Sequence, residues 1–348
     1  MKTYREAMDG LSFTDEQKRA MTSRLLTEAT RAAPRKRPVR RLAVGIAVAA
    51  VLAMTVTAGA AGGLKPAAEA FSGLFGIVTP AQTEVIDHIG YPIGASDTDN
   101  GVTITADAIL ADRYSYAVVY SVVRENGEPL FKALDNLMAL DFDDWDLEFP
   151  GFQGGGHGAC YFTDLDPTDP ALQFVETVTL DAPLPQGTAK VHFKGIQRQS
   201  LNYETGEIRR LDSIPGCWNL AFDFKSEDCS VDLAKNQSFH VNGMEATLDS
   251  VVLSPLSVQV DYTVDSEVTW NYEADPQHDH QEYDRYFGTL PLLIHLKDGS
   301  VVDMTFSGGD ISHGDGKTVC RKGEVFERIL PLEDVESVTV GDVDISVG

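Results

Sequence analysis

The chain has 348 residues, of which 53 are aspartate or glutamate and 28 are lysine or arginine, so its formal net charge at pH 7 is −25. This excess of negative charge argues against direct binding of nucleic acid, because contacts to phosphate groups require clusters of basic side chains. None of the four cysteines forms a CxxC pair, which excludes the usual zinc-ribbon and thioredoxin-like sites.

The N-terminal segment, residues 1–41, carries 11 basic and 5 acidic residues, a net charge of +6, whereas the remainder carries −31. Its pattern predicts two short helices: one ends near Gly10, and the other starts at the capping box Thr14–Gln17 and ends before Pro34. Because so short a segment rarely folds alone, its apolar faces indicate a partner: the membrane surface, a second copy of the chain or a groove in a cytoplasmic protein. The alternative is a helical tail that only sets membrane topology.

The next segment, residues 42–64, is uncharged and directly follows a basic cluster that ends in Arg40 and Arg41. As a helix, the 22 residues Leu42–Gly63 would be about 33 Å long, enough to cross a hydrocarbon core of about 30 Å. We therefore predict a single transmembrane helix, with the basic N-terminus in the cytoplasm and the C-terminus outside. Two alternatives stay open: a buried helix of a soluble protein, and a signal peptide cleaved after Ala60.

Residues 65–95 contain three prolines among small residues and are predicted to form a stalk with short helices at Ala67–Phe75 and Ala81–Ile89. From Gly101 onward, alternating apolar residues and an abundance of valine, isoleucine, threonine and tyrosine are typical of β-strands. Asn-Gly or Asp-Gly pairs predict hairpins at residues 126–127, 242–243 and 298–299. The expected strands are residues 102–110, 114–123, 174–180, 189–196, 220–224, 238–241, 246–253, 257–264, 290–296, 301–306, 324–330 and 335–340.

This succession of short strands predicts a mainly β fold: two tandem antiparallel β-sandwich (immunoglobulin-like) domains outside the membrane, behind one transmembrane helix and a short cytoplasmic helical segment. A polar run at residues 228–237 precedes a fresh pair of strands and indicates the domain boundary. The first extracellular domain is therefore expected at residues 96–230 and the second at residues 231–348.

The outer region offers two clusters with the side chains that metal ions prefer. The acidic stretch Asp135–Asp169 supplies oxygen ligands suited to calcium, but it matches no known calcium loop, and we interpret it as a solvated acidic loop. His278, His280 and Glu282 are the stronger candidates, because two histidines on one side of a strand, with a carboxylate, suit zinc. A polar hairpin tip would have the same composition, so we predict no metal ion here and keep these three residues only as candidates.

All four cysteines lie after the predicted span, as expected if only that side of the membrane is oxidising. Cys217 and Cys229 are the preferred disulfide pair, and four free thiols are the alternative. We interpret the glycine-rich residues 154–158 as a flexible loop, and residues 314–318 do not complete a phosphate-binding loop, since Ile311 occupies the first glycine position. We predict no enzyme and no cofactor, with an extracellular metal-dependent hydrolase as the alternative.

Several patches of the chain together resemble a known family. Residues 4–8 and 11–14, followed by an amphipathic helix, a basic cluster and a span, look like the start of a Gram-positive membrane anti-sigma factor that pairs with an extracytoplasmic-function sigma factor. The outer patches that resemble this family are residues 100–106 and 111–114 for its first extracellular domain, and residues 241–243, 252–258 and 333–341 for the immunoglobulin-like domain that often follows.

The resemblance implies a single-pass membrane protein whose cytoplasmic helices sequester a sigma factor while its extracellular domains respond to an envelope signal. Residues 1–41 contain no cysteine or histidine, so no zinc ion is implied there. The alternative is an anchored cell-surface adhesion or ligand-binding module without a role in transcription. The residues implied to contact the sigma factor are the apolar ones found above: Tyr4, Met8, Leu11, Phe13, Met21, Leu25 and Leu26.

Overall fold

The computed structural model describes residues 67–76, 79–131, 140–165, 169–201, 208–224, 227–271 and 276–347. All of them belong to one compact unit, Thr55–Gly348. No helix in these ranges is both long enough and apolar enough to cross a membrane. The predicted cytoplasmic helices and transmembrane helix, together with the seven residues predicted to contact a sigma factor, lie outside the described residues.

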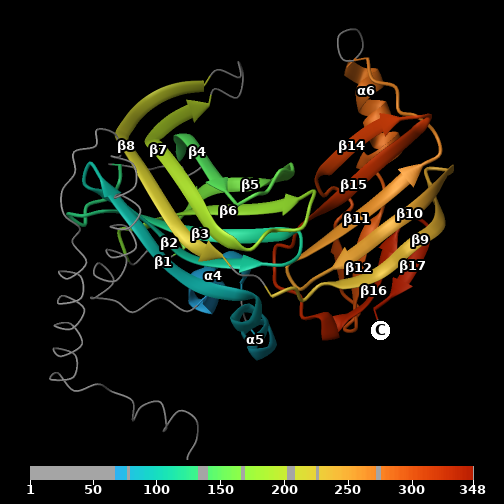
Figure 1. Cartoon of the computed structure of the whole chain (residues 1–348), viewed down its shortest axis with the longest axis horizontal. Coiled ribbons are helices and arrows are strands. Elements are labelled where there is room, and N and C mark those ends of the chain that lie inside the picture. The colour runs from blue at the N-terminus through green and yellow to red at the C-terminus, as the bar shows by residue number, and fades with distance from the viewer. Residues whose placement is uncertain are drawn as a thin grey trace, which may run out of the picture. The chain divides into compact units, whose positions relative to one another are not determined.

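The described residues are mainly β-structure in several antiparallel sheets, which confirms the coarse fold prediction (Figure 1). We call Gly90–Phe224 the N-terminal β region. One of its sheets has the order β1 (Gly90–Asp99), β2 (Val102–Ala111), β3 (Ser115–Arg124), β6 (Leu172–Leu180) and β5 (Gly156–Thr163). The other sheet has the order β4 (Leu140–Glu148), β7 (Gly187–Leu201) and β8 (Ile208–Phe224).

We call Val231–Ser346 the C-terminal β region, and it also has two sheets. Its first sheet has the order β14 (Gly309–Gly314), β15 (Lys317–Val325), β11 (Ser257–Val264), β10 (Met244–Leu253) and β9 (Val231–Val241). Its second sheet has the order β13 (Val301–Asp303), β12 (Leu292–Leu296), β16 (Val335–Val340) and β17 (Val343–Ser346). The helical elements of this region are α6 (Pro276–Tyr283), the π-helical turn η2 (Asp284–Gly288) and the 3₁₀ turn η3 (Leu332–Asp334).

The core of the N-terminal β region lies between its two sheets and is rich in aromatic side chains. Tyr116 and Tyr120 on β3 point into it, because residues two apart on a strand share a face. The rings of Phe142, Phe174 and Phe193 meet there with centroids 4.5 to 5.8 Å apart. Each such pair adds about 0.5–1.5 kcal/mol to the burial of its rings. The two sheets are thus joined by a continuous aromatic layer.

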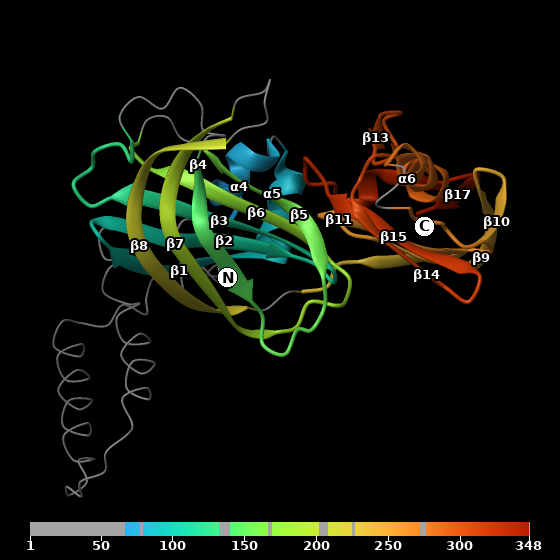
Figure 2. The same cartoon turned by 90° about the horizontal axis from the view of Figure 1, so that it is seen from above.

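The helices α4 (Ala67–Phe75) and α5 (Pro80–Ile89) pack on the opposite face of the five-stranded sheet (Figure 2). The prediction of two short helices here is confirmed. The prediction that this segment is a stalk is wrong, because Phe71 and Ile86 are fully buried in a core shared with that sheet. Apolar side chains at helical spacing drive this docking, and the helices are part of the folded unit.

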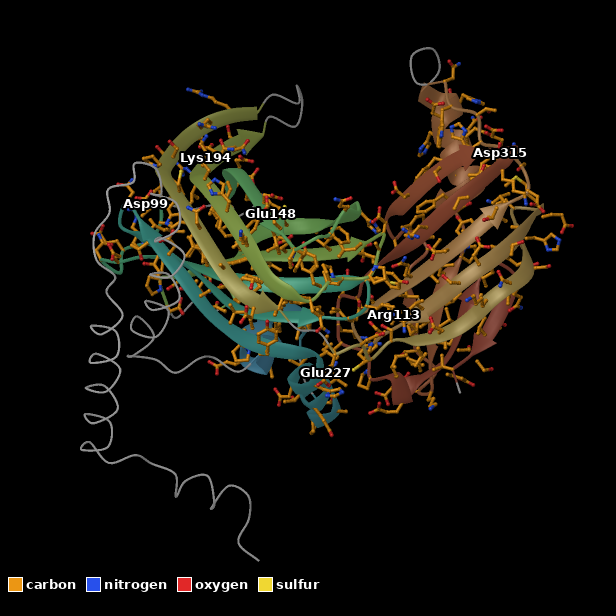
Figure 3. The ribbon with its side chains drawn as sticks, viewed as in Figure 1. Asp99, Arg113, Glu148, Lys194, Glu227 and Asp315 are labelled. Carbon is orange, nitrogen blue, oxygen red and sulfur yellow. The ribbon has the colours of Figure 1, made fainter. Side chains whose placement is uncertain are left out.

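The acidic stretch at residues 135–169 is not the solvated loop that its composition suggested, because it contains β4 and β5. Along β4 the exposed aspartates are interspersed with core residues such as Phe142, whose burial outweighs the low strand propensity of aspartate. The neighbouring strand β7 is basic, and its Lys194, labelled in Figure 3, lies opposite Asp144 in the register. Cross-strand pairing of opposite charges favours this arrangement.

The glycine-rich residues 154–158 are likewise not simply a flexible loop, since β5 starts at Gly156. Gly158 lies so close to β6 that an added Cβ would be 1.9 Å from the carbonyl oxygen of Thr177. Glycine is required there because it lets two backbones approach closely.

Most strands predicted from alternation are present. Residues 257–264 form β11 and residues 335–340 form β16 with the expected bounds, while β2 extends one residue further at its end and β3 is shifted by one residue at both ends. The Asn242-Gly243 hairpin turn has φ angles of 49° and 80°, the left-handed conformations that this dipeptide favours.

Candidate functional site

Two four-residue turns, one from each β region, meet at a buried polar junction. In the turn Asp112–Ser115 the N–H of the first residue donates to the carbonyl oxygen of the last at 2.9 Å. The turn Ser254–Ser257 has the same hydrogen bond at the same distance. The first side chain of each turn caps the backbone: Asp112 accepts from the N–H of Ser115 at 2.6 Å, and the Ser254 hydroxyl accepts from the N–H of Ser257 at 2.9 Å. These are aspartate- and serine-capped turns of the kind these residues favour.

The second oxygen of Asp112 crosses to the other turn. Its Oδ2 accepts from the Ser257 hydroxyl at 2.7 Å and from the Ser254 hydroxyl in a shorter contact. Asp112 is 1 % exposed, and this burial raises the pKa of its carboxyl, while the hydrogen bonds from the two serines and from its own turn act in the opposite direction. The Asp112 carboxyl group is therefore hydrogen-bonded to both β regions. The turn Ser254–Ser257 lies within the patch 252–258 singled out by the resemblance, and the first three residues of the turn Asp112–Ser115 lie within the patch 111–114.

Further contacts surround this junction. The Arg113 guanidinium donates to Asp228 at 2.8 Å and to Asp232 at 2.7 Å, and its place is labelled in Figure 3. The ring Nε2 of His157 donates to the carbonyl oxygen of Gly323 on β15 at 2.6 Å. The apolar part of the junction consists of Leu256 and Ile329, which pack into the core under α4 and α5.

A cleft of about 630 Å³ opens between β4 and β5, the edge strands of the two sheets in the N-terminal β region. We call it the Glu176 cleft, after the titratable side chain in its lining that is most deeply buried. Glu176 is 2 % exposed and shares the inward face of β6 with Phe174 and Val178. A carboxyl group in an apolar core is unusual unless it is fully hydrogen-bonded.

Glu176 is only partly hydrogen-bonded. Its Oε1 accepts from the hydroxyl of Tyr116 at 2.5 Å, whereas its Oε2 has no hydrogen-bond partner within the ranges that the structure describes. Burial raises the pKa of Glu176 to about 8, the Tyr116 hydrogen bond opposes this shift, and the charge of Asp146 adds to it. Glu176 is therefore mostly protonated at neutral pH in the free protein.

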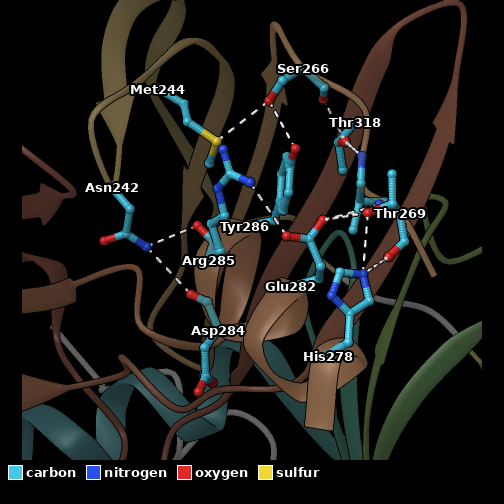
Figure 4. Close-up of polar contacts among 11 residues, drawn as sticks. Asn242, Met244, Ser266, Thr269, His278, Glu282, Asp284, Arg285, Tyr286 and Thr318 are labelled. Carbon is cyan, nitrogen blue, oxygen red and sulfur yellow. Dashed lines mark hydrogen bonds and ion pairs between the residues drawn. The ribbon is translucent and has the colours of Figure 1, made fainter. Parts of the chain in front are cut away.

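The predicted metal candidates are placed on a helix, which corrects the expectation that they share one side of a strand. On α6, residues two apart point in different directions, about 200° around the axis. The ring Nε2 of His278 donates to the Thr269 carbonyl at 2.9 Å, and Glu282 accepts from the N–H of Thr269 at 3.1 Å (Figure 4). The ring Nε2 of His280 instead lies 3.7 Å from Oδ2 of Asp284. In the described ranges, no group of three or more His, Cys, Asp or Glu side chains is arranged to hold a metal ion.

The predicted disulfide between Cys217 and Cys229 is wrong, and all four cysteines are free. The N–H of Cys217 donates to Asp99, at the β1–β2 turn, whereas Asp228 next to Cys229 is bound to Arg113, beyond the far end of β2. A strand of this length separates them by about 30 Å, and a disulfide needs Cα atoms within about 7 Å. The two cysteines are only 12 residues apart in the sequence, but the chain continues as the extended strand β8 after Cys217, and this places Cys229 far away.

No protein-family model and no curated protein matches the chain. A solved structure described as the conserved domain protein from Bacillus anthracis is similar over 70 % of this chain and 73 % of that chain, with 17 % identity and a TM-score of 0.41. A likeness at this level carries no argument about function. The functional assignment therefore rests on the sequence and on the contacts described above.

Proposed function

We propose that this chain is a single-pass membrane anti-sigma factor. Residues 1–41 would sequester a sigma factor in the cytoplasm, residues 42–64 would span the cell membrane, and the β regions would respond to an envelope signal outside. The observation that carries the proposal is the division of the chain into a basic segment with apolar helix faces, a run of 22 uncharged residues and an acidic remainder.

We propose further that the β regions are tandem immunoglobulin-like sandwiches on the extracellular side. Two clusters of buried residues support this: one runs from Ala95 to Phe224, and the other from Phe239 to Ile345 with Val231 packed against it. The junction at Asp112 supports transmission of a signal, because its buried hydrogen bonds link the two regions. The start of α4 at Ala67, directly after the proposed span, leaves little slack between the folded region and the membrane.

The test is capture of a sigma factor by the full chain in detergent, with the identity of the captured protein established by mass spectrometry. Introducing charges into the predicted contact face, with Leu25→Asp and Leu26→Asp, is expected to abolish capture. The control adds the same two charges to the polar side of the same helix, with Ser23→Asp and Thr27→Asp, and should retain it. Equal capture by both variants, or no capture by the wild type, would contradict the proposal.

The second candidate function is an anchored ligand-binding module of the cell surface without a transcriptional role. The Glu176 cleft favours it, because a cleft with an unused buried oxygen fits a binding site whether or not a sigma factor is involved. Deletion of residues 2–33 discriminates between the two candidates. Under the first, the deletion releases sigma-dependent transcription; under the second, the transcript profile is unchanged.

A further inference from the structure

The Glu176 cleft contains hydrogen-bonding capacity that the described chain does not use. Besides Glu176 Oε2, the buried hydroxyl of Tyr120, which points into the same core, has no hydrogen-bond partner within the described ranges. Roughly 90 % or more of buried polar groups in proteins are hydrogen-bonded. Two such atoms in one core, beside a cleft, indicate that a ligand supplies the missing partner for Glu176.

The charged groups around the cleft determine which sign of charge the ligand carries. Three carboxyl groups belong to its lining residues, those of Asp146, Glu148 and Glu176, and these lining residues include no lysine or arginine. The lining histidine, His157, uses its Nε2 atom in the bond to Gly323. An anion would be repelled by this set, whereas a cation stabilises the ionised form of Glu176.

The other lining residues select the shape of the ligand. Trp145, Phe149 and Phe152 provide apolar surface and aromatic rings, which attract organic cations. The volume of about 630 Å³ lies within the range of small-molecule sites. Because Glu176 is only 2 % exposed, a slim head group is needed to reach its oxygen.

We propose that the Glu176 cleft binds a small organic cation, with a primary ammonium group bound by the Glu176 carboxylate and an apolar body lying against the aromatic residues of β4 and the segment that follows it. This inference is independent of the proposed sigma-factor function. It assigns a ligand class to the N-terminal β region alone, and it concerns binding without a chemical reaction.

The proposal makes binding dependent on pH, because the cation binds the ionised form of Glu176. The titratable groups that face Glu176 are Tyr116 and Tyr120 on β3, Asp146 on β4 and Cys160 on β5. The two tyrosines and Cys160 have pKa values raised above their ordinary alkaline values. Below pH 8 the affinity should therefore rise about tenfold per pH unit, and above it the affinity should level off.

The experiment is isothermal titration calorimetry on the full chain in an uncharged detergent, with 2-phenylethylammonium as the probe. We expect saturable 1:1 binding at about pH 9, and binding weaker by at least about tenfold for 2-phenylethanol and for the trimethylammonium analogue. Absence of saturable binding, or equal binding of the neutral alcohol, would overturn the proposal.

Variants assign the binding to Glu176. Glu176→Gln should weaken the binding at least about tenfold and remove its pH dependence. The control is Asp144→Asn, which removes an exposed carboxylate of β4, a strand beside the cleft, at a position outside the lining, and it should leave the affinity unchanged. Thermal unfolding establishes that each variant is folded; if Glu176→Gln is not, the pH profile of the wild type decides. A flat profile between about pH 6 and pH 8, or full affinity in a folded Glu176→Gln variant, contradicts the assignment.

Discussion

The hydroxyl of Ser257 donates a 2.7 Å hydrogen bond to the carboxyl group of Asp112, which lies 145 residues earlier in the chain. The two residues belong to different β regions, and each sits in a tight turn with the same pattern of backbone hydrogen bonds. A buried polar contact of this kind fixes geometry, because either partner left alone in the interior is costly.

Asp112→Ala is therefore expected to destabilise the folded region by about 2 to 4 kcal/mol, since it leaves two serine hydroxyls and two backbone amides without their acceptor. Urea denaturation followed by tryptophan fluorescence measures this change. The control is Asp87→Asn on the exposed side of α5, which should alter the stability by less than about 0.5 kcal/mol. In a double-mutant cycle with Ser257→Ala, a coupling energy near zero would contradict the role of the junction.

Glu176 should make the stability of the ligand-free protein depend on pH. Its pKa is about 8 in the folded protein against 4.5 ordinarily, so the folded state binds more protons between these values and stability falls as the pH rises through this window. The full effect is up to about 5 kcal/mol above pH 8. Glu176→Gln should remove this loss and unfold at a higher urea concentration than the wild type at about pH 9. Parallel pH profiles for the two proteins would contradict the assignment.

Lys322 should have the opposite effect. It is fully buried, its Nζ lies 4.2 Å from the centroid of the Phe287 ring, and burial lowers its pKa from 10.5 to about 8. Between about pH 8 and pH 10.5 the unfolded state therefore binds more protons than the folded state, so the stability should rise with pH over this range. Lys322→Met should lack this rise, whereas Lys317→Met, at an exposed lysine paired with Asp265, should keep it. Urea denaturation at a series of pH values from about 7 to 10 measures the difference.

Gly158 should not tolerate a side chain. Because its Cβ would overlap the Thr177 carbonyl oxygen, Gly158→Ala is expected to destabilise the protein by about 2 kcal/mol or more. Gly314→Ala is the matched control, since Gly314 is also in a strand and an added Cβ would meet no atom within 4 Å. Thermal unfolding of both variants measures the contrast, and equal melting temperatures would show that β5 adjusts without cost.

Local patterns predicted the parts of the fold that depend on local physics. The helix at Pro80–Ile89 was visible from its spacing, and the structure adds a capping box between Thr79 and Gln82 that the sequence also contains. The packing of α4 on the sheet could not be predicted, because a short apolar helix after a proline has the same sequence pattern in a stalk as it has on the face of a sheet. Long-range packing decides between them.

The candidate sites were harder to predict for a related reason. The Asp112 junction joins two patches that were noted separately, and nothing in their spacing indicated that they meet. Glu176 did have a local signal: it occupies an inward position of an alternating strand, between Phe174 and Val178. The cluster at His278 was predicted on a strand, where residues two apart share a face. It lies on a helix instead, and there the side chains of His278 and His280 point in different directions.

His157 has a double position, since it lines the Glu176 cleft and also binds the C-terminal β region through Gly323. By thermodynamic reciprocity, a ligand that binds better when this hydrogen bond is intact must strengthen the bond, and one that binds better when it is broken must weaken it. Ligand binding in the cleft of the N-terminal β region would then change the affinity of that region for the C-terminal β region. The size of this coupling is bounded by the free energy of a single buried hydrogen bond, about 1 kcal/mol, which suits a graded response better than a switch.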